Sequence, residues 1–162
     1  IINDYLSLAK HQTGIVQVIT LNDEIKKTAD LLTSFANQRN IGIVLKPNHD
    51  LYIKMDPIEL KQLLVNIIKN GIESMDRAGF ITIETVQDQD MAKIMITDTG
   101  IGLTKNQIDV LGTPFYSLKE RGTGIGLTVC YNIIQKYKGK IVVTSKLAIG
   151  TTFTIYIPLC ST

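Results

Sequence analysis

The sequence predicts an α+β fold, a two-layer α/β sandwich in which helices cover one face of a mixed β-sheet. The chain has 162 residues, of which 44% are hydrophobic and 20% charged, and this is enough apolar material for the core of one domain. Stretches with helical spacing of apolar residues alternate with short runs of β-branched residues. Because successive strands are separated by short turns, we expect consecutive hairpins, which argue against a doubly wound parallel sheet.

Net charge and cysteine content limit the classes of protein to which the chain can belong. Seventeen Lys and Arg against fifteen Asp and Glu give a formal net charge of +2, too small to indicate binding to nucleic acid or to a membrane surface. Cys130 and Cys160 form no CxxC pair, so they indicate neither a disulfide framework nor a zinc site. A reducing compartment, and therefore a cytoplasmic location for the domain, is the expectation.

The sequence shows no transmembrane span and no signal peptide. It opens without Met and already in a helical pattern, so we expect a fragment of a longer protein, in whose remaining part a membrane anchor could lie. Residues 1–10 carry apolar side chains at helical spacing, and residues 11–14 break this pattern, which indicates the end of a helix. Residues 15–20 are apolar and β-branched. The next helix is expected to begin after Asn22 and to stop near residues 40–42.

A strong signal for a helix start lies at Asp56. Asp56 can cap the helix, Pro57 suits its first turn, and Glu59 completes a capping box. The helix is predicted to run to about Met75. Its apolar side consists of Leu60, Leu64, Ile67, Ile68 and Met75.

The remaining elements are mainly strands. They are predicted at residues 41–45, 51–54, 80–86, 91–97, 141–145 and 152–157. A second capping box, from Thr104 to Gln107, predicts a short helix, and a last helix is predicted at residues 124–137. Residues 111–126 are rich in glycine, threonine and charge, which is typical of a mobile functional loop.

A cluster of glycines precedes the last helix, in the segment Gly122-Thr123-Gly124-Ile125-Gly126-Leu127. Glycines at a helix start let backbone N–H groups approach phosphate oxygens, and the positive end of the helix favours an anion. The nearby Lys119 and Arg121 could neutralise phosphate charge. An ordinary flexible loop with solvated basic residues is the alternative, and the cluster is neither a Walker P-loop nor a Rossmann fingerprint.

A carboxylate stands at the end of a predicted strand, in Asp98-Thr99-Gly100-Ile101-Gly102. It can accept a hydrogen bond from an exocyclic amine, which separates adenine from guanine, while the two glycines clear space for a flat ligand. The alternative is an Asx turn after the strand. An aspartic protease with this single Asp-Thr-Gly would have to be a dimer, and the Ile-Gly that follows departs from that family.

Two asparagines, Asn66 and Asn70, recur with Glu73 at i, i+4 and i+7 on the polar side of the central helix. Their side-chain oxygens could bind Mg²⁺, which prefers hard oxygen ligands and shares its coordination with water and substrate phosphates. A solvated helix face is the alternative for such a pair.

The order of these motifs resembles the ATP-binding domain of sensor histidine kinases, of the GHKL superfamily that includes gyrase, MutL and a heat-shock chaperone. Residues 66–71 look like the N box, residues 98–102 like the first glycine box, residues 113–116 like the F box and residues 122–126 like the second glycine box. The residues in these boxes are most similar to those of sporulation-type or nitrogen-type kinases. The resemblance implies a Bergerat-type fold with an ATP lid at about residues 111–123.

The resemblance also implies roles for particular residues. Asp98 would hold the adenine amino group, Asn70 with Asn66 would coordinate Mg²⁺, and Lys119 would contact the phosphates, so Asn66, Asn70 and Lys119 are the expected catalytic residues. The further expected contacts to ATP are Gly100, Gly102, Phe115, Arg121, Gly122, Thr123, Gly124, Ile125, Gly126, Leu127 and Thr151.

Family resemblance implies transfer of the γ-phosphoryl group to a histidine on a dimerisation hairpin, and then to an aspartate of a response regulator. Residues 1–14 resemble the end of that hairpin, and residues 15–162 would form the catalytic domain. Neither His11 nor His49 has the context of the acceptor. The expected partners are the chain's own hairpin in a homodimer, a response regulator and protein inhibitors, but no nucleic acid. A serine kinase of the anti-sigma-factor type and a non-catalytic regulatory module are the alternatives.

Overall fold

The computed structural model describes residues 14–111 and 125–160 of the chain. Within these ranges seven strands and four helices follow one another. In chain order they are β1 (Gln17–Thr20), α2 (Leu21–Gln38), β2 (Ile41–Lys46), β3 (Tyr52–Met55), α3 (Pro57–Glu73), β4 (Gly79–Asp88), β5 (Met91–Asp98), α4 (Lys105–Asp109), α5 (Ile125–Lys136), β6 (Lys140–Lys146) and β7 (Gly150–Pro158).

The main sheet has five strands in the order β2-β4-β5-β7-β6. β2 and β4 are parallel and the other pairs are antiparallel, so the predicted mixed sheet is confirmed. Hairpins join β4 to β5 and β6 to β7 as expected, but the expectation is wrong for β2 and β3. Instead, β3 pairs with β1 in a separate antiparallel sheet in which Ile19 lies opposite Ile53.

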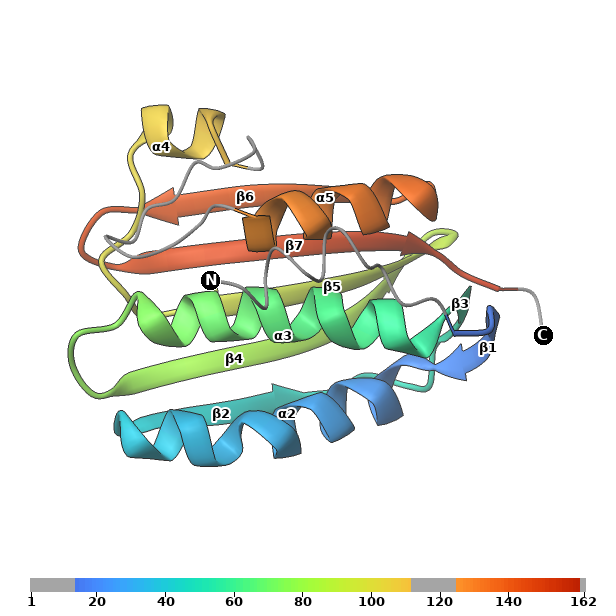
Figure 1. The fold of residues 1–162 in the computed structure, drawn as a ribbon, viewed down its shortest axis with the longest axis horizontal. Helices are drawn as coiled ribbons and strands as arrows, with labels where there is room; N and C mark the ends of the chain where they lie inside the picture. The colour runs from blue at the N-terminus through green and yellow to red at the C-terminus, as the bar shows by residue number, and fades with distance from the viewer. Residues whose placement is uncertain (1–13, 112–124, 161–162) are drawn as a thin grey trace.

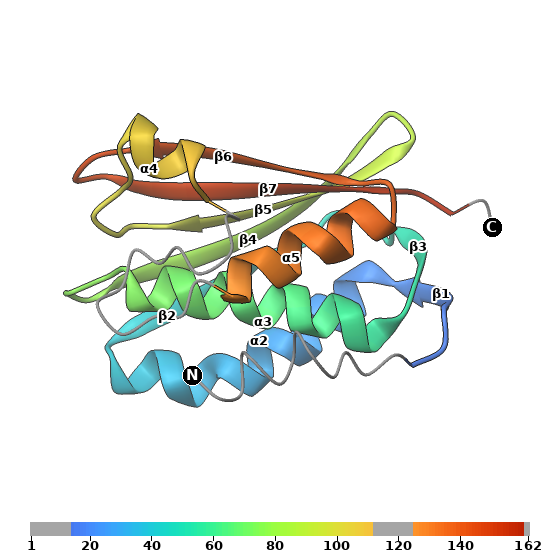
Figure 2. The same ribbon diagram turned by 45° about the horizontal axis from the view of Figure 1, so that its top comes forward.

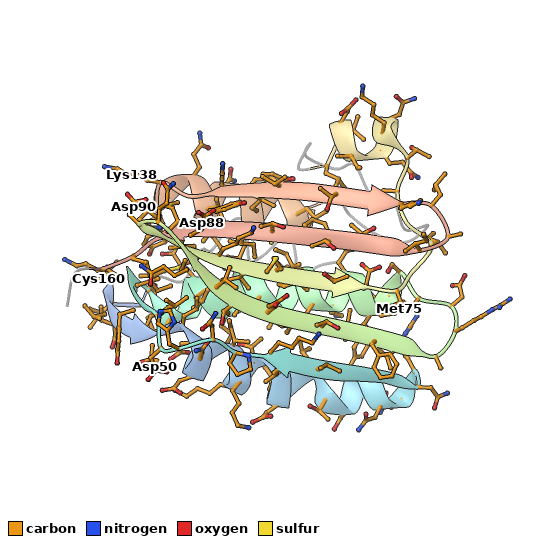
Figure 3. The ribbon with its side chains drawn as sticks, turned by 180° about the vertical axis from the view of Figure 1, so that it is seen from behind. Asp50, Met75, Asp88, Asp90, Lys138 and Cys160 are labelled. Carbon is orange, nitrogen blue, oxygen red and sulfur yellow. The ribbon has the colours of Figure 1, made fainter. Side chains whose placement is uncertain are left out.

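Helices α2, α3 and α5 lie together on one face of the five-stranded sheet (Figures 1 and 2). No described helix covers the opposite face of the sheet, which is turned toward the viewer in Figure 3. The core lies between the two layers, where Ile68 of α3, Ile94 of β5 and Ile155 of β7 are completely buried. All five residues of the predicted apolar side of α3 are buried, and the two-layer α+β prediction is confirmed.

The start of α3 confirms one prediction and corrects another. Asp56 caps the helix, because its Oδ1 accepts a hydrogen bond from the Ile58 N–H at 2.9 Å. The predicted capping box is wrong, since the Asp56 N–H donates to the Tyr137 hydroxyl at 3.3 Å. The Glu59 carboxylate is buried and accepts hydrogen bonds from Lys136 and Tyr137 of the α5 end. A buried carboxylate needs strong donors, and the end of α5 supplies them.

Other boundaries differ from expectation by a few residues. α2 begins at Leu21 rather than after Asn22, directly after β1, and it ends at Gln38. The capping box of α4 is confirmed, with reciprocal hydrogen bonds between Thr104 and Gln107. The helix end predicted at residues 1–14 lies outside the described residues except for Gly14, whose N–H donates to Asp56 Oδ2 at 2.5 Å. None of the described helices is long and apolar enough to cross a lipid bilayer.

Candidate functional site

A cavity of about 300 Å³ opens where α3 and β5 end and β7 begins. It is lined by four residues that the sequence predicted as site residues, namely Asn70, Asp98, Gly102 and Thr151. These residues come from three elements and the loop after β5, so the fold brings together what the sequence separates by up to about eighty residues. The cavity is therefore the candidate site.

Asp98 is the last residue of β5 and has only 5% of its surface exposed. Its Oδ1 accepts hydrogen bonds from the N–H of Gly100 at 2.9 Å and from the N–H of Thr151 at 3.2 Å. The first of these closes an Asx turn, so the structural alternative weighed for this motif is realised. The second ties the turn to the start of β7, which makes the carboxylate part of the cavity wall.

Burial raises the pKa of the Asp98 carboxyl above its usual value of 3.8. Hydrogen bonds from the N–H groups of Gly100 and Thr151 oppose this shift without cancelling it, and so does the nearby Ser74 hydroxyl. An ionised carboxylate offers about four lone-pair positions, and the N–H groups of Gly100 and Thr151 occupy the two on Oδ1. Oδ2 can accept a hydrogen bond from a ligand N–H.

The two glycines after Asp98 are required by close packing within the protein itself. A Cβ on Gly100 would lie 2.4 Å from the Ser74 Oγ and 2.8 Å from the Ser74 carbonyl oxygen. Gly102 has φ +79°, and a Cβ there would lie 2.4 Å from the Lys146 carbonyl oxygen. The loop therefore lies tightly between the end of α3 and the turn that joins β6 to β7.

The two asparagines of α3 have different surroundings. Asn70 lines the cavity, together with Glu73 one turn later. Asn66 lies one turn earlier, and its Nδ2 donates to the carbonyl oxygen of Gly126 in the first turn of α5 at 3.2 Å. The structure thus joins Asn66 to the second glycine box and leaves Asn70 facing the cavity.

Several predicted site residues lie outside the described residues: Phe115, Lys119, Arg121, Gly122, Thr123 and Gly124. The backbone of Ile125 begins α5, and Gly126 and Leu127 follow in its first turn. Leu127 packs partly buried against the core, and the nearest atom to a Cβ on Gly126 would be Asn66 Cγ at 3.9 Å. α5 therefore begins beside the polar side of α3.

Sequence reasoning missed several residues that line the cavity, among them Ser74 and Phe153. Ser74 follows directly after α3 and lines the cavity, and its hydroxyl donates to the Gly71 carbonyl oxygen at 2.7 Å. Phe153 of β7 lines the cavity and is buried. A serine after a helix end and a phenylalanine in a strand are ordinary in sequence, and only the packing of α3 and β7 around the cavity places them here.

Comparison with known proteins agrees with this geometry. A family model described as "Histidine kinase-, DNA gyrase B-, and HSP90-like ATPase" matches residues 55–161. Sporulation kinase B of Bacillus subtilis (strain 168) is 40% identical over 159 residues, which cover 98% of this chain and 37% of that kinase. The sensor histidine kinase ZraS of Escherichia coli (strain K12) is 33% identical over 160 residues, 98% of this chain and 34% of that kinase. The chain thus spans little more than a third of these two relatives.

Among solved structures, the catalytic domain of the histidine kinase ThkA in a nucleotide-free form superimposes with a TM-score of 0.82. It is 26% identical, and the match covers 90% of this chain and 96% of that domain. The matched family model spans α3 and every strand that borders the cavity. The chain therefore belongs to the histidine kinase-, DNA gyrase B- and HSP90-like ATPase family.

Proposed function

We propose that this chain is the ATP-binding catalytic part of a sensor histidine kinase, and that it transfers the γ-phosphoryl group of ATP to a histidine outside residues 1–162. Membership of an ATPase family implies that the chain binds ATP. The observation that carries the proposal is the buried Asp98 carboxylate, whose Oδ1 is held by two backbone N–H groups and whose Oδ2 can still accept a hydrogen bond, in the lining of a 300 Å³ cavity. The similarity to named histidine kinases supports the reaction.

Asp98 would recognise the base. The exocyclic amine of adenine is a hydrogen-bond donor and suits the free lone pair of the carboxylate, whereas the O6 of guanine is an acceptor and would be repelled by it. Gly102 and Thr151 line the same cavity as Asp98 and would border the base. This arrangement would favour adenine nucleotides over guanine nucleotides.

Two further residues that line the cavity suit Mg²⁺. Asn70 and Glu73 both line it and carry the hard oxygen atoms that this ion prefers. The described residues contain no group of three or more His, Cys, Asp and Glu side chains that could hold a metal ion. Because Mg²⁺ takes much of its coordination from phosphate and water, few side-chain oxygens are needed, and we assign Asn70, together with Asn66 one turn earlier, to the magnesium site.

The transfer itself requires the chain to position and neutralise charge rather than to supply a nucleophile. The bond between the γ-phosphorus and the β,γ-bridging oxygen breaks, ADP leaves, and a phosphorus–nitrogen bond forms with the acceptor imidazole, which gives up its proton. In the proposal Lys119 and Arg121 neutralise phosphate charge, and the backbone of residues 122–127 contacts the phosphates. Phe115 belongs to the lid in the same scheme.

The partners follow from the proposed reaction. The acceptor histidine would lie on a dimerisation hairpin of the intact homodimer, and the phosphoryl group would then pass to an aspartate of a response regulator. Protein inhibitors are a further expected class of partner. We place the domain in the cytoplasm, where ATP and a response regulator are both available.

One experiment tests the proposal directly. The chain is incubated with γ-labelled ATP, Mg²⁺ and a separately produced helical hairpin that carries the acceptor histidine of a relative such as sporulation kinase B. We expect acid-labile, base-stable label on the hairpin, and none when its histidine is replaced by glutamine. ATP binding without transfer would favour a non-catalytic module, and label on serine would favour a serine kinase. Absence of ATP binding would overturn the proposal.

A further inference from the structure

One hydroxyl on an edge strand connects three parts of the candidate site. Ser145 lies near the end of β6, and its Oγ accepts a hydrogen bond from the Leu103 N–H at 2.7 Å. The same Oγ lies 3.0 Å from the carbonyl oxygen of Gly150 and 2.8 Å from the Oγ1 of Thr151. Leu103 and Thr151 both line the cavity, whereas Ser145 does not.

The hydrogen-bonding capacity of Ser145 matches these contacts. A serine hydroxyl has one proton to donate and two lone pairs that accept. The Leu103 N–H occupies one lone pair, and the proton goes either to the Gly150 carbonyl or to Thr151. When Ser145 donates to Thr151, the Thr151 proton is free to point into the cavity, where it can meet an acceptor nitrogen of a purine.

We propose that Ser145 is a positioning residue for the base of the bound nucleotide, acting through the Leu103 backbone and the Thr151 hydroxyl. The inference deepens the proposed function and rests on it. Ser145 holds Leu103, at the end of the loop that follows β5, against β6. It also orients the hydroxyl of Thr151, whose N–H donates to Asp98 Oδ1. The base would then contact Leu103 and Thr151, and Ser145 would position both of them without contacting the base.

The backbone holds the middle of the loop independently. The Ala148 N–H donates to the carbonyl oxygen of Ile101 at 2.8 Å, and no side chain takes part in this bond. Loss of the Ser145 hydroxyl should therefore loosen the Leu103 end of the loop while the protein stays folded. The neighbouring Thr144 offers a matched control, because it is exposed and lies on the opposite face of β6.

The test compares Ser145→Ala, Ser145→Thr and Thr144→Ala by calorimetric titration with ATP and with ADP, each in the presence of Mg²⁺. Ser145→Ala should weaken both nucleotides by the same factor, about five- to tenfold, because the defect lies at the base and not at the phosphates. Ser145→Thr retains a hydroxyl and should recover most of the affinity. Thr144→Ala should bind like the unmodified chain.

Amide hydrogen exchange of Leu103, followed by NMR without nucleotide, provides a second readout. The Leu103 amide should exchange at least several times faster in Ser145→Ala and at the normal rate in Thr144→Ala. Unchanged affinity in Ser145→Ala, or equal losses in both alanine variants, would overturn the inference. If the unmodified chain binds no adenine nucleotide, the proposed function fails instead, and the exchange rate of Leu103 still decides whether Ser145 positions the loop.

Discussion

The side-chain amide of Asn66 donates a hydrogen bond to the backbone carbonyl of Gly126 at 3.2 Å, across 60 residues of sequence. This bond joins the polar side of α3 to the first turn of α5, the helix that follows the predicted lid. Because the NH₂ group of Asn66 faces Gly126, its Oδ1 points away from that carbonyl. Asn66 thus connects two helices, whereas Asn70 faces the cavity, and the two asparagines should respond differently to the same substitution.

Asn66→Asp should destabilise the protein, and Asn70→Asp should not. The first change places a carboxylate against the Gly126 carbonyl and removes the donor, which should lower the free energy of unfolding by about 1 to 3 kcal/mol. Asn70→Asp should stay within about 0.5 kcal/mol of the unmodified chain. Urea unfolding monitored by circular dichroism measures both values.

The same pair tests the magnesium assignment. Asn70→Asp should change ATP affinity in the presence of Mg²⁺ more than in EDTA, because it alters an oxygen ligand of the ion. Asn66→Asp should weaken binding under both conditions, since it disturbs the start of α5. Equal effects of Asn70→Asp with and without Mg²⁺ would show that this asparagine is purely structural.

Asp98→Asn should weaken ATP binding without weakening the fold. An asparagine Oδ1 can still accept from the Gly100 and Thr151 N–H groups, but its NH₂ group would face the adenine amine. Loss of the charge-assisted bond should cost about 1.5 to 3 kcal/mol of binding, or roughly ten- to a hundredfold in affinity. Calorimetry with ATP measures the loss, and unchanged affinity would contradict the assignment of Asp98 to the base.

The raised pKa of Asp98 gives a defined pH dependence. Because burial holds the folded-state pKa above 3.8, the carboxyl is protonated at a higher pH than an ordinary aspartate, and its capacity to accept the adenine amine falls there. The protonated form stabilises the fold, an effect fully present below pH 3.8 and lost as the pH rises through the raised pKa. The ratio of ATP affinities of the unmodified chain and Asp98→Asn should therefore shrink on acidification. A ratio independent of pH would contradict this prediction.

The sequence predicted the elements and motifs that depend on neighbouring residues. The Asp56 cap, the Thr104 capping box and the turn after Asp98 are all made by groups within three residues of one another, and the structure contains each of them. The amphipathic pattern of α3 likewise identified the side that faces the core. Local chemistry decides such features, so a single sequence suffices to read them.

Contacts between distant elements could not be read in this way. The pairing of β1 with β3 and the positions of Ser74, Ser145 and Phe153 at the site follow from strand order, which local periodicity does not encode. Glu59 shows most clearly how a local sequence pattern and a long-range contact can disagree. Its position predicts a capping box, but the buried carboxylate binds donors 77 and 78 residues away because burial makes strong partners necessary.

Tyr137→Phe tests that buried cluster. The Tyr137 hydroxyl donates to the Glu59 carboxylate and accepts from the Asp56 N–H, so its removal leaves Glu59 with Lys136 and leaves Asp56 without this acceptor. The free energy of unfolding at pH 7 should fall by about 1 to 3 kcal/mol. Tyr52→Phe is the matched control, because its side chain is substantially exposed and the same substitution there should cost less than about 0.5 kcal/mol.

The titration of the Tyr137 hydroxyl should change the free energy of unfolding at alkaline pH. Burial and the hydrogen bond to Glu59 raise the pKa of Tyr137 from 10.0 to about 12. Its contribution to stability is therefore complete below pH 10 and is lost as the pH rises through about 12. The Tyr137→Phe variant lacks this hydroxyl and its pH-dependent contribution. The difference in free energy of unfolding between the unmodified chain and this variant should therefore narrow between pH 10 and 12. Urea unfolding at pH 7 and pH 11 measures the narrowing, and a constant difference, or one matched by Tyr52→Phe, would show that the hydroxyl does not hold α5 to the start of α3.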